Sequence, residues 1–140
     1  TKFNIENYRS STCKTTKSFY INNIMKYVFD IDPYDLNLKV FTSKLSLVKY
    51  LNKHGYQHIH NFDNVEGLSL LYEHYGIDLL LYLNKDFCTE DTLDHELIHI
   101  TWLIARSIGH PLNQDNQEFQ TYLFTSLKRK IRKKINYEKS

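Results

Sequence analysis

The residues best suited to chemistry in this chain are His95, Glu96 and His99, which stand in the segment His-Glu-Leu-Ile-His. On an α-helix, positions four apart differ by only about 40° around the axis, so both imidazoles project from the same side. This spacing lets two imidazole nitrogens bind one zinc ion. Glu96, about 100° away from His95 on the helix, would flank the metal and accept a proton from metal-bound water. The pattern therefore predicts a zinc site with Glu96 as general base.

A strong helical pattern surrounds this segment and must position it. Its apolar residues recur three or four positions apart and form one stripe: Leu93, Leu97, Ile100, Ile104 and Ile108. Asp91 or Thr89 can cap the start, and Gly109 and Pro111 end the helix. The stripe lies roughly opposite the two histidines. We therefore expect one side of this helix to be anchored in a core and the other side to open to a cleft.

A catalytic zinc ion also needs a third protein ligand and one open position. Trp102 and Ala105 stand where the metzincin pattern requires glycine and histidine, which excludes that class. A glutamate from the next helix is the other common solution, and Glu118 is the candidate on ligand type. Asp115 and His110 are the alternatives.

The last helix starts near Asn113 or Asp115 and carries an apolar stripe of its own, Phe119, Leu123, Leu127 and Ile131. Glu118 and Tyr122 lie together on its polar side. We expect this polar side to meet the face that carries the histidines. Tyr122 would then donate a hydrogen bond to an oxyanion or to a ligand carboxylate, and a boundary tyrosine with no such role is the alternative.

The motif at His95–His99 followed by Glu118 resembles the gluzincin branch of the zinc metallopeptidases. Residues 67–127 also resemble small HExxH proteins common in bacteriophages and, less closely, short gene-regulatory peptidases that cleave repressors. The resemblance covers about the C-terminal half of the chain. It implies His95, His99 and Glu118 as zinc ligands and Glu96 as the catalytic residue.

The same resemblance has one departure and one further implication. The family pattern Asn-Glu-x-x-Ser-Asp around the third ligand is replaced here by Gln-Glu-Phe-Gln-Thr-Tyr at Gln117–Tyr122. By resemblance, the strand expected at Ile77–Leu83 is the sheet edge that would hold an extended peptide substrate by main-chain pairing.

Length and composition predict one globular α+β domain. The chain has 140 residues, of which 41% are hydrophobic and 24% charged, so it is neither disordered nor membrane-embedded on composition. Eighteen cations against sixteen anions give a net charge of only +2, which argues against a dedicated nucleic-acid coat. Two cysteines cannot form a disulfide framework and indicate reduced thiols, so we expect a cytoplasmic protein, in the host cytoplasm if phage-encoded.

The chain divides into a polar arm at residues 1–17, extended or loosely held, and a single zincin-like α+β domain at residues 18–140. In this domain a small mixed or antiparallel sheet would pack on two or three helices. A helix is expected over Thr42–His54, with Leu45, Val48 and Leu51 on its apolar side and Gly55 as its C-terminal cap. The strands are expected at Tyr27–Ile31, Leu38–Phe41, Leu68–Tyr72 and Ile77–Leu83, with Gly76 in the hairpin loop between the last two.

Other polar residues carry weaker signals. His58 and His60 share one face if extended and form a possible second metal pair, although a solvated loop is the simpler interpretation. Cys88 is expected to be an inert, half-buried thiol rather than a ligand. The basic segment Lys128–Lys134 would grip phosphates or an acidic partner, or would be a solvated helix end whose cations favour the helix dipole.

The sequence thus predicts a zinc-dependent metallopeptidase that uses Zn²⁺ and acts on a protein or peptide substrate, with a narrow target because so small a chain has little room for a deep pocket. The alternative is a non-catalytic zincin-fold module that binds a host protein or a nucleic acid, with metal absent. A third possibility is a purely structural metal closed by four ligands, the fourth being His110 or Asp115.

Overall fold

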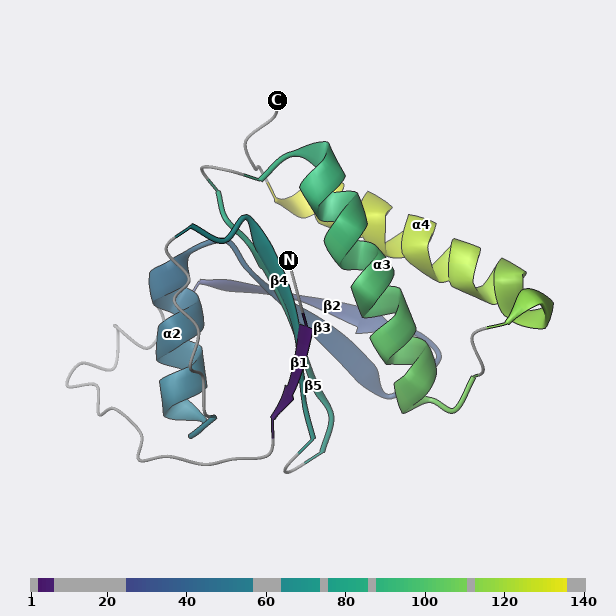
Figure 1. Ribbon diagram of the computed structural model, residues 1–140, viewed down its shortest axis with the longest axis horizontal. Helices are drawn as coiled ribbons and strands as arrows, with labels where there is room; N and C mark the ends of the chain where they lie inside the picture. Colours follow the sequence, from purple (N-terminus) through teal and green to yellow (C-terminus); the bar gives the residue numbers. More distant parts are fainter. Residues whose placement is uncertain are drawn as a thin grey trace.

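The computed structural model describes residues 3–6, 25–56, 64–73, 76–85, 88–110 and 113–135, the first of these ranges as backbone only. It is a mixed α+β fold, which confirms the predicted class. Five strands form one sheet: β1 (Phe3–Glu6), β2 (Lys26–Ile31), β3 (Leu36–Phe41), β4 (Gly67–Tyr72) and β5 (Asp78–Leu83). Their order across the sheet is β1-β4-β5-β3-β2 (Figure 1).

Two antiparallel hairpins, β2–β3 and β4–β5, make up most of this sheet. They are joined side by side through the parallel pair β3–β5, and β1 adds to β4 in parallel. The predicted turn residue Gly76 has φ 111°, a backbone conformation that favours glycine. The four strands expected from the sequence are therefore present and paired as two hairpins.

Helices cover both faces of the sheet (Figure 1). Helix α2 (Lys44–Lys53) packs on one face, and α3 (Glu90–Ser107) and α4 (Gln117–Lys134) pack on the other, with the short η1 (Gln114–Asn116) leading into α4. Alternate residues of β5 enter the two cores, Leu79 and Leu81 toward α3 and Leu80 toward α2. A strand covered on both faces has no polar side, which explains the nearly continuous apolar run of β5.

The helix that carries the motif forms as expected. Thr89 is its N-cap, and the Thr89 hydroxyl accepts a hydrogen bond from the Thr92 backbone N–H. The helix runs to Ser107, and Gly109 follows with φ 77°, as expected for a glycine after a helix end. In the part of the chain that the structure describes, no helix is both long and apolar enough to cross a bilayer.

Three expectations about the sheet and α2 are wrong in detail. β5 is not a sheet edge, because β4 pairs with it on one side and β3 on the other; the edge strands are β1 and β2. Phe3–Glu6, within the predicted arm, forms β1, and the rest of residues 1–17 lies outside the described residues. In α2 the buried side carries Leu47 and Leu51, whereas Leu45 is 63% exposed, because Tyr50 rather than Leu45 completes the apolar face.

Candidate metal-binding site on helix α3

The two histidines of the motif lie on the solvent side of α3, as the apolar stripe predicts. His95 is exposed and His99 half-buried, whereas Leu97, Ile100 and Ile104 on the opposite side are fully buried. The ring centroids of His95 and His99 are 4.9 Å apart, with an angle of 71° between the ring planes. Two imidazoles this close on one open helix face have the donor chemistry and the spacing of a zinc pair.

Glu96 lies on a different side of the helix and is fully buried over β4. Its Oε1 is 2.7 Å from the hydroxyl of Ser69, and the Ser69 hydroxyl is also 3.1 Å from the Glu96 backbone carbonyl. Among the described residues, Glu96 Oε2 has no hydrogen-bond partner although it is buried. Unmet buried carboxylate oxygens are rare, and each is explained by strain, an ordered water, a bound ion or a chemical role.

Gly67, at the start of β4, makes room for this carboxylate. A Cβ added to Gly67 would lie 2.8 Å from Glu96 Cγ, closer than real Cβ atoms approach, and 3.0 Å from Thr92 Cγ2, which is a tight contact. The Thr92 hydroxyl donates to Glu66 Oε1 at 2.8 Å beside it. A side chain at this position would therefore force Glu96 to shift, which favours glycine.

The third predicted ligand does not join the histidine pair. Glu118 is exposed at the start of α4, and Tyr122 one turn later is 71% exposed. Helix α4 contacts the flank of α3 that carries Asp94, through an ion pair from Lys128 Nζ to Asp94 Oδ1 at 2.8 Å. The expectation that the polar face of α4 meets the histidine face is therefore wrong: α4 packs on a neighbouring flank of α3 and turns Glu118 and Tyr122 to solvent.

The alternative ligands His110 and Asp115 do not join the histidine pair either. The His110 ring stacks on Phe119, with centroids 4.4 Å apart and an angle of 12°, and Asp115 is exposed in η1. Across residues 88–110, 113–135 and the other described ranges, no three His, Cys, Asp or Glu side chains stand together as a metal-binding group. Of the predicted ligands, only His95 and His99 lie side by side in the described part of the chain. The predicted pair His58 and His60, together with His74 and Cys13, lies outside the described residues.

An apolar hollow lies next to the histidine pair, and the sequence did not predict it. The indole of Trp102 meets the ring of His99 edge-on, with centroids 6.3 Å apart, and Trp102 is 48% exposed. A hollow of about 250 Å³ extends from it between α3 and α4, lined by Ile98, Thr101, Trp102, Gln120, Thr121 and Phe124. This space is smaller than a typical small-molecule pocket and is of the order of one large side chain.

Cys88 lies near the start of α3 and is fully buried and unpaired by disulfide. Burial raises the pKa of its thiol to about 12, and the negative charges of Glu66, Glu90 and Glu96 act in the same direction. A thiol that stays protonated at neutral pH is a poor metal ligand and a poor nucleophile. This is consistent with the expectation of an inert thiol, although Cys88 is fully buried rather than half-buried.

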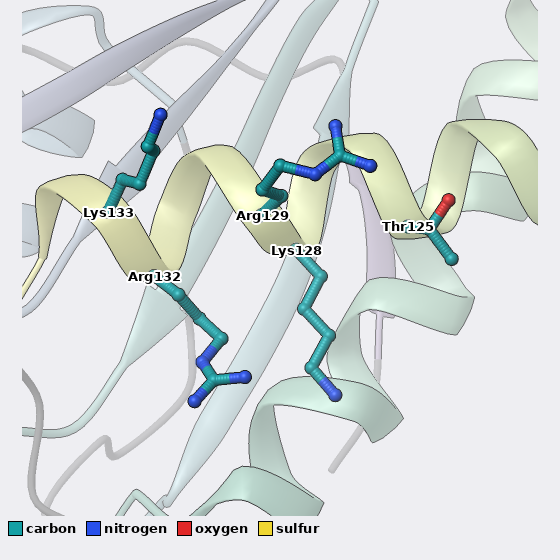
Figure 2. A pocket seen from close by; sticks show the side chains of 5 residues that line it. All are labelled: Thr125, Lys128, Arg129, Arg132 and Lys133. Atoms are coloured by element: carbon teal, nitrogen blue, oxygen red, sulfur yellow. The ribbon is translucent and has the colours of Figure 1, made fainter.

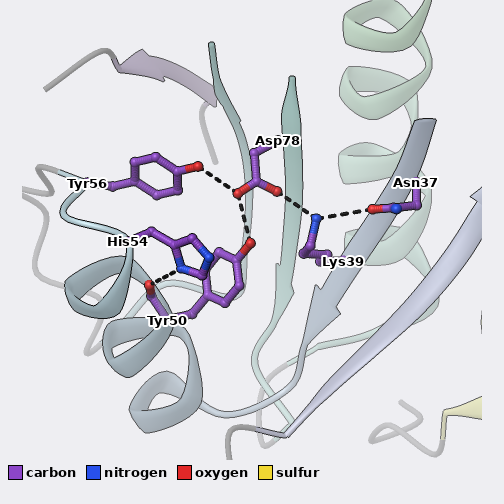
Figure 3. A network of polar contacts seen from close by, with 6 residues as sticks. All are labelled: Asn37, Lys39, Tyr50, His54, Tyr56 and Asp78. Carbon is purple, nitrogen blue, oxygen red and sulfur yellow. Dashed lines mark hydrogen bonds and ion pairs between the residues drawn. The ribbon is translucent and has the colours of Figure 1, made fainter. Parts of the chain in front are cut away.

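A second buried polar cluster lies on the α2 face of the sheet (Figure 3). Tyr50 and Tyr56 each donate a hydrogen bond to Asp78 Oδ2 at 2.8 Å, and Lys39 Nζ is 2.9 Å from Asp78 Oδ1. The His54 ring stacks on Tyr50 at 4.0 Å. Burial, followed by the charge of Asp78, raises the pKa of Tyr50 far above its usual range. Both carboxylate oxygens of Asp78 have partners, so this cluster stabilises the contact between α2 and β5. No local sequence motif predicted it.

Comparison with known proteins adds no relative to this picture. No family model, no curated protein and no solved structure matches the chain. The function must therefore be argued from the residues themselves, and the arrangement with the clearest chemical meaning is the histidine pair next to a buried glutamate that has only one of its two carboxylate oxygens hydrogen-bonded.

Proposed function

We propose that this protein is a zinc-dependent metallopeptidase in which His95 and His99 are two of the metal ligands and Glu96 is the general base. The observation that carries the proposal is the contrast between the imidazole pair, in which His95 is exposed and His99 half-buried, and the neighbouring carboxylate, which is fully buried with Oε2 unpaired among the described residues. Leaving a buried oxygen without a hydrogen bond costs roughly 1–3 kcal/mol. Such a cost is typical of a group kept for function.

The chemistry divides between the metal and the chain. A zinc ion at His95 and His99 would polarise the scissile carbonyl and lower the pKa of a water molecule towards about 7. Ser69 holds Oε1 of Glu96 and thereby leaves Oε2 as the oxygen that takes up a proton and later delivers it to the leaving amine. The hollow beside Trp102 would seat one apolar side chain of a peptide whose backbone lies along the histidine face.

The alternative is a non-catalytic module, and one observation favours it. Glu96 has no exposed surface, so a substrate water reaches its Oε2 only if the side chain or its cover moves. A protein that only binds a partner has no need of such movement. The two functions make opposite predictions for Glu96, which allows a direct test.

The test combines metal analysis with peptide cleavage. Protein purified with zinc should hold about one zinc ion per chain, a stoichiometry expected for a single zincin site. His95→Asn/His99→Asn should lose the metal, and Glu96→Gln should keep it. With a mixed peptide library analysed by mass spectrometry, Glu96→Gln should cleave roughly 100-fold more slowly or worse, as expected when a general base is removed. Asp91→Asn, an exposed carboxylate on the same helix, is the matched control and should behave as wild type.

Each other outcome has a definite meaning. Protein without stoichiometric zinc, or Glu96→Gln protein that cleaves as fast as wild type, overturns the peptidase proposal. Bound zinc without cleavage, together with unfolding by a chelator, indicates a structural metal instead.

A further inference from the structure

The positive charge of this protein is concentrated at one end of α4. Six of the eighteen cations lie in the segment Lys128–Lys134, so the rest of the chain carries twelve cations against sixteen anions. The near-neutral net charge therefore conceals a strongly basic helix end on an otherwise acidic protein. Such a separation of charge attracts a polyanion to one place on the surface.

Four of these cations surround a common space. A surface hollow of about 530 Å³ is lined by Thr125, Lys128, Arg129, Arg132 and Lys133, which we call the basic hollow. Figure 2 shows Arg129 and Lys133 extending on one side of α4 and Lys128 and Arg132 extending on the other side, toward α3. The side chains thus form two rows on α4 that point away from each other.

The row facing α3 is held in place by acidic residues. Lys128 Nζ pairs with Asp94 at 2.8 Å, and Arg132 Nε lies 3.5 Å from Glu90 Oε2. In the described part of the chain, no ion pair within 4.0 Å joins Arg129 or Lys133 to a carboxylate. The row of Lys128 and Arg132 is therefore held by the fold, and the row of Arg129 and Lys133 presents two exposed charges that no carboxylate of the described residues compensates.

An exposed aromatic ring continues the row of Arg129 and Lys133. By helical geometry, Tyr122 lies within about 40° of both residues around the axis and about 10 Å before Arg129 along it. Tyr122 is 71% exposed, although a ring of this size normally buries much of its surface. Glu118, exposed one turn before Tyr122, places a negative charge at the far end of the same face. The face therefore reads, in order, acid, aromatic ring, cations.

We propose that the basic hollow and Tyr122 bind single-stranded nucleic acid, with phosphates at Arg129 and Lys133 and an unstacked base on the Tyr122 ring. Cations along a groove, with an aromatic ring in line, are the combination used for single strands. A duplex has the phosphates, but its base faces are stacked inside and cannot reach the Tyr122 ring. An acidic peptide has negative carboxylates but no base to stack on that ring. The exposed ring thus favours the single strand over both. This binding is independent of the zinc chemistry proposed for α3.

The test measures binding of a fluorescein-labelled oligothymidylate of about 16 nucleotides, within the range of known single-strand sites, by anisotropy at several salt concentrations. For single strands the log–log salt slope is about −0.7 per phosphate contact, so Arg129→Gln/Lys133→Gln should reduce the slope by about 1.4. Lys130→Gln/Lys134→Gln removes the same charge from the same helix outside the basic hollow and should leave the slope nearly unchanged. Tyr122→Ala should weaken binding roughly 5- to 100-fold with the slope unchanged, because stacking is not ionic.

Circular dichroism melting confirms that each variant is folded. The proposal is overturned if wild-type protein does not bind the probe at low salt, or if the two double variants weaken binding equally. If a matched duplex binds equally well and Tyr122→Ala has no effect, the Tyr122 ring does not stack on bases. This result would overturn the proposal and identify duplex nucleic acid as the ligand. Displacement of the probe by polyglutamate as effective as by unlabelled oligothymidylate would instead identify an acidic protein as the partner.

Discussion

The hydroxyl of Ser69 in β4 lies 2.7 Å from Oε1 of Glu96 in α3, and both residues are fully buried. This contact joins the sheet to the helix that carries the histidine pair, across 27 positions of sequence. Oε1 of Glu96 therefore has a hydrogen-bond partner, and Oε2 is the carboxylate oxygen that has none among the described residues. The geometry of the candidate site therefore depends on a strand residue as much as on the motif.

Ser69→Ala should destabilise the protein by about 1–3 kcal/mol, because both oxygens of the buried Glu96 carboxylate would then lack a protein partner. Urea unfolding followed by circular dichroism measures the change. Ser107→Ala is the control, since its hydroxyl only donates back to the Leu103 carbonyl within α3 at 2.8 Å, and it should change stability by no more than about 0.5 kcal/mol. Equal effects of the two substitutions would contradict the importance given to the Ser69 contact.

Gly67→Ala should also destabilise the fold, by about 1–3 kcal/mol, through overpacking against Glu96 Cγ. The effect comes from the neighbouring side chain, so it should shrink when Glu96→Ala is combined with it, although Thr92 Cγ2 at 3.0 Å remains in contact. A double-mutant cycle by thermal unfolding measures this coupling. Additive effects of the two substitutions would show that Gly67 does not accommodate Glu96.

The sequence predicted the elements of this fold well, because local signals determine them. The stripe from Leu93 to Ile104 gave the face of α3, and Gly76 and Gly109 marked a hairpin and a helix end. The central position of β5 was not predictable in this way. β5 lies inside the sheet because it pairs in parallel with β3, a strand that precedes it in the chain and is separated from it by α2 and β4. No local sequence pattern encodes such long-range pairing.

The candidate site was predictable only in part for the same reason. His95, Glu96 and His99 stand in one short motif, so helical periodicity alone places them. The partner of Glu96, Ser69, and the position of Glu118 depend on how distant elements pack. The ion pair between Lys128 and Asp94 helps to set α4 on a flank of α3 away from the histidines, and residue type gave no indication of that choice.

Asp78→Ala should be the most destabilising of these substitutions, by about 3–5 kcal/mol, because it leaves the Lys39 ammonium without its carboxylate partner. It also removes the acceptor of the Tyr50 and Tyr56 hydroxyls. Asp115→Ala, an exposed aspartate, should change stability by no more than about 0.5 kcal/mol. Urea unfolding of both variants provides the comparison, and a loss below about 1 kcal/mol for Asp78→Ala would contradict a structural role of the cluster.

Cys88 should make the protein less stable as the pH rises from about 9 to about 12. Its pKa is raised in the folded state to about 12 from 9.0, so over this range the unfolded chain loses the thiol proton first and is stabilised relative to the fold. The contribution is complete below pH 9 and is lost progressively above it. Cys88→Ala should therefore show a shallower decline in unfolding free energy with pH than wild type. Parallel declines for the two proteins would contradict the raised pKa.

Trp102 is the only tryptophan of the chain, and its edge-on contact with His99 makes it a reporter of metal binding. Co²⁺ bound at the His95–His99 pair should quench the Trp102 fluorescence to a saturable level, because a paramagnetic ion then lies close to the indole. Zn²⁺ should restore the emission, since it binds nitrogen ligands more tightly than Co²⁺. His95→Asn/His99→Asn should abolish the saturable quenching, and Arg106→Ala, an exposed residue of the same helix, should retain it. Quenching that persists in the double histidine variant would place the metal elsewhere and remove the basis for a zinc site on α3.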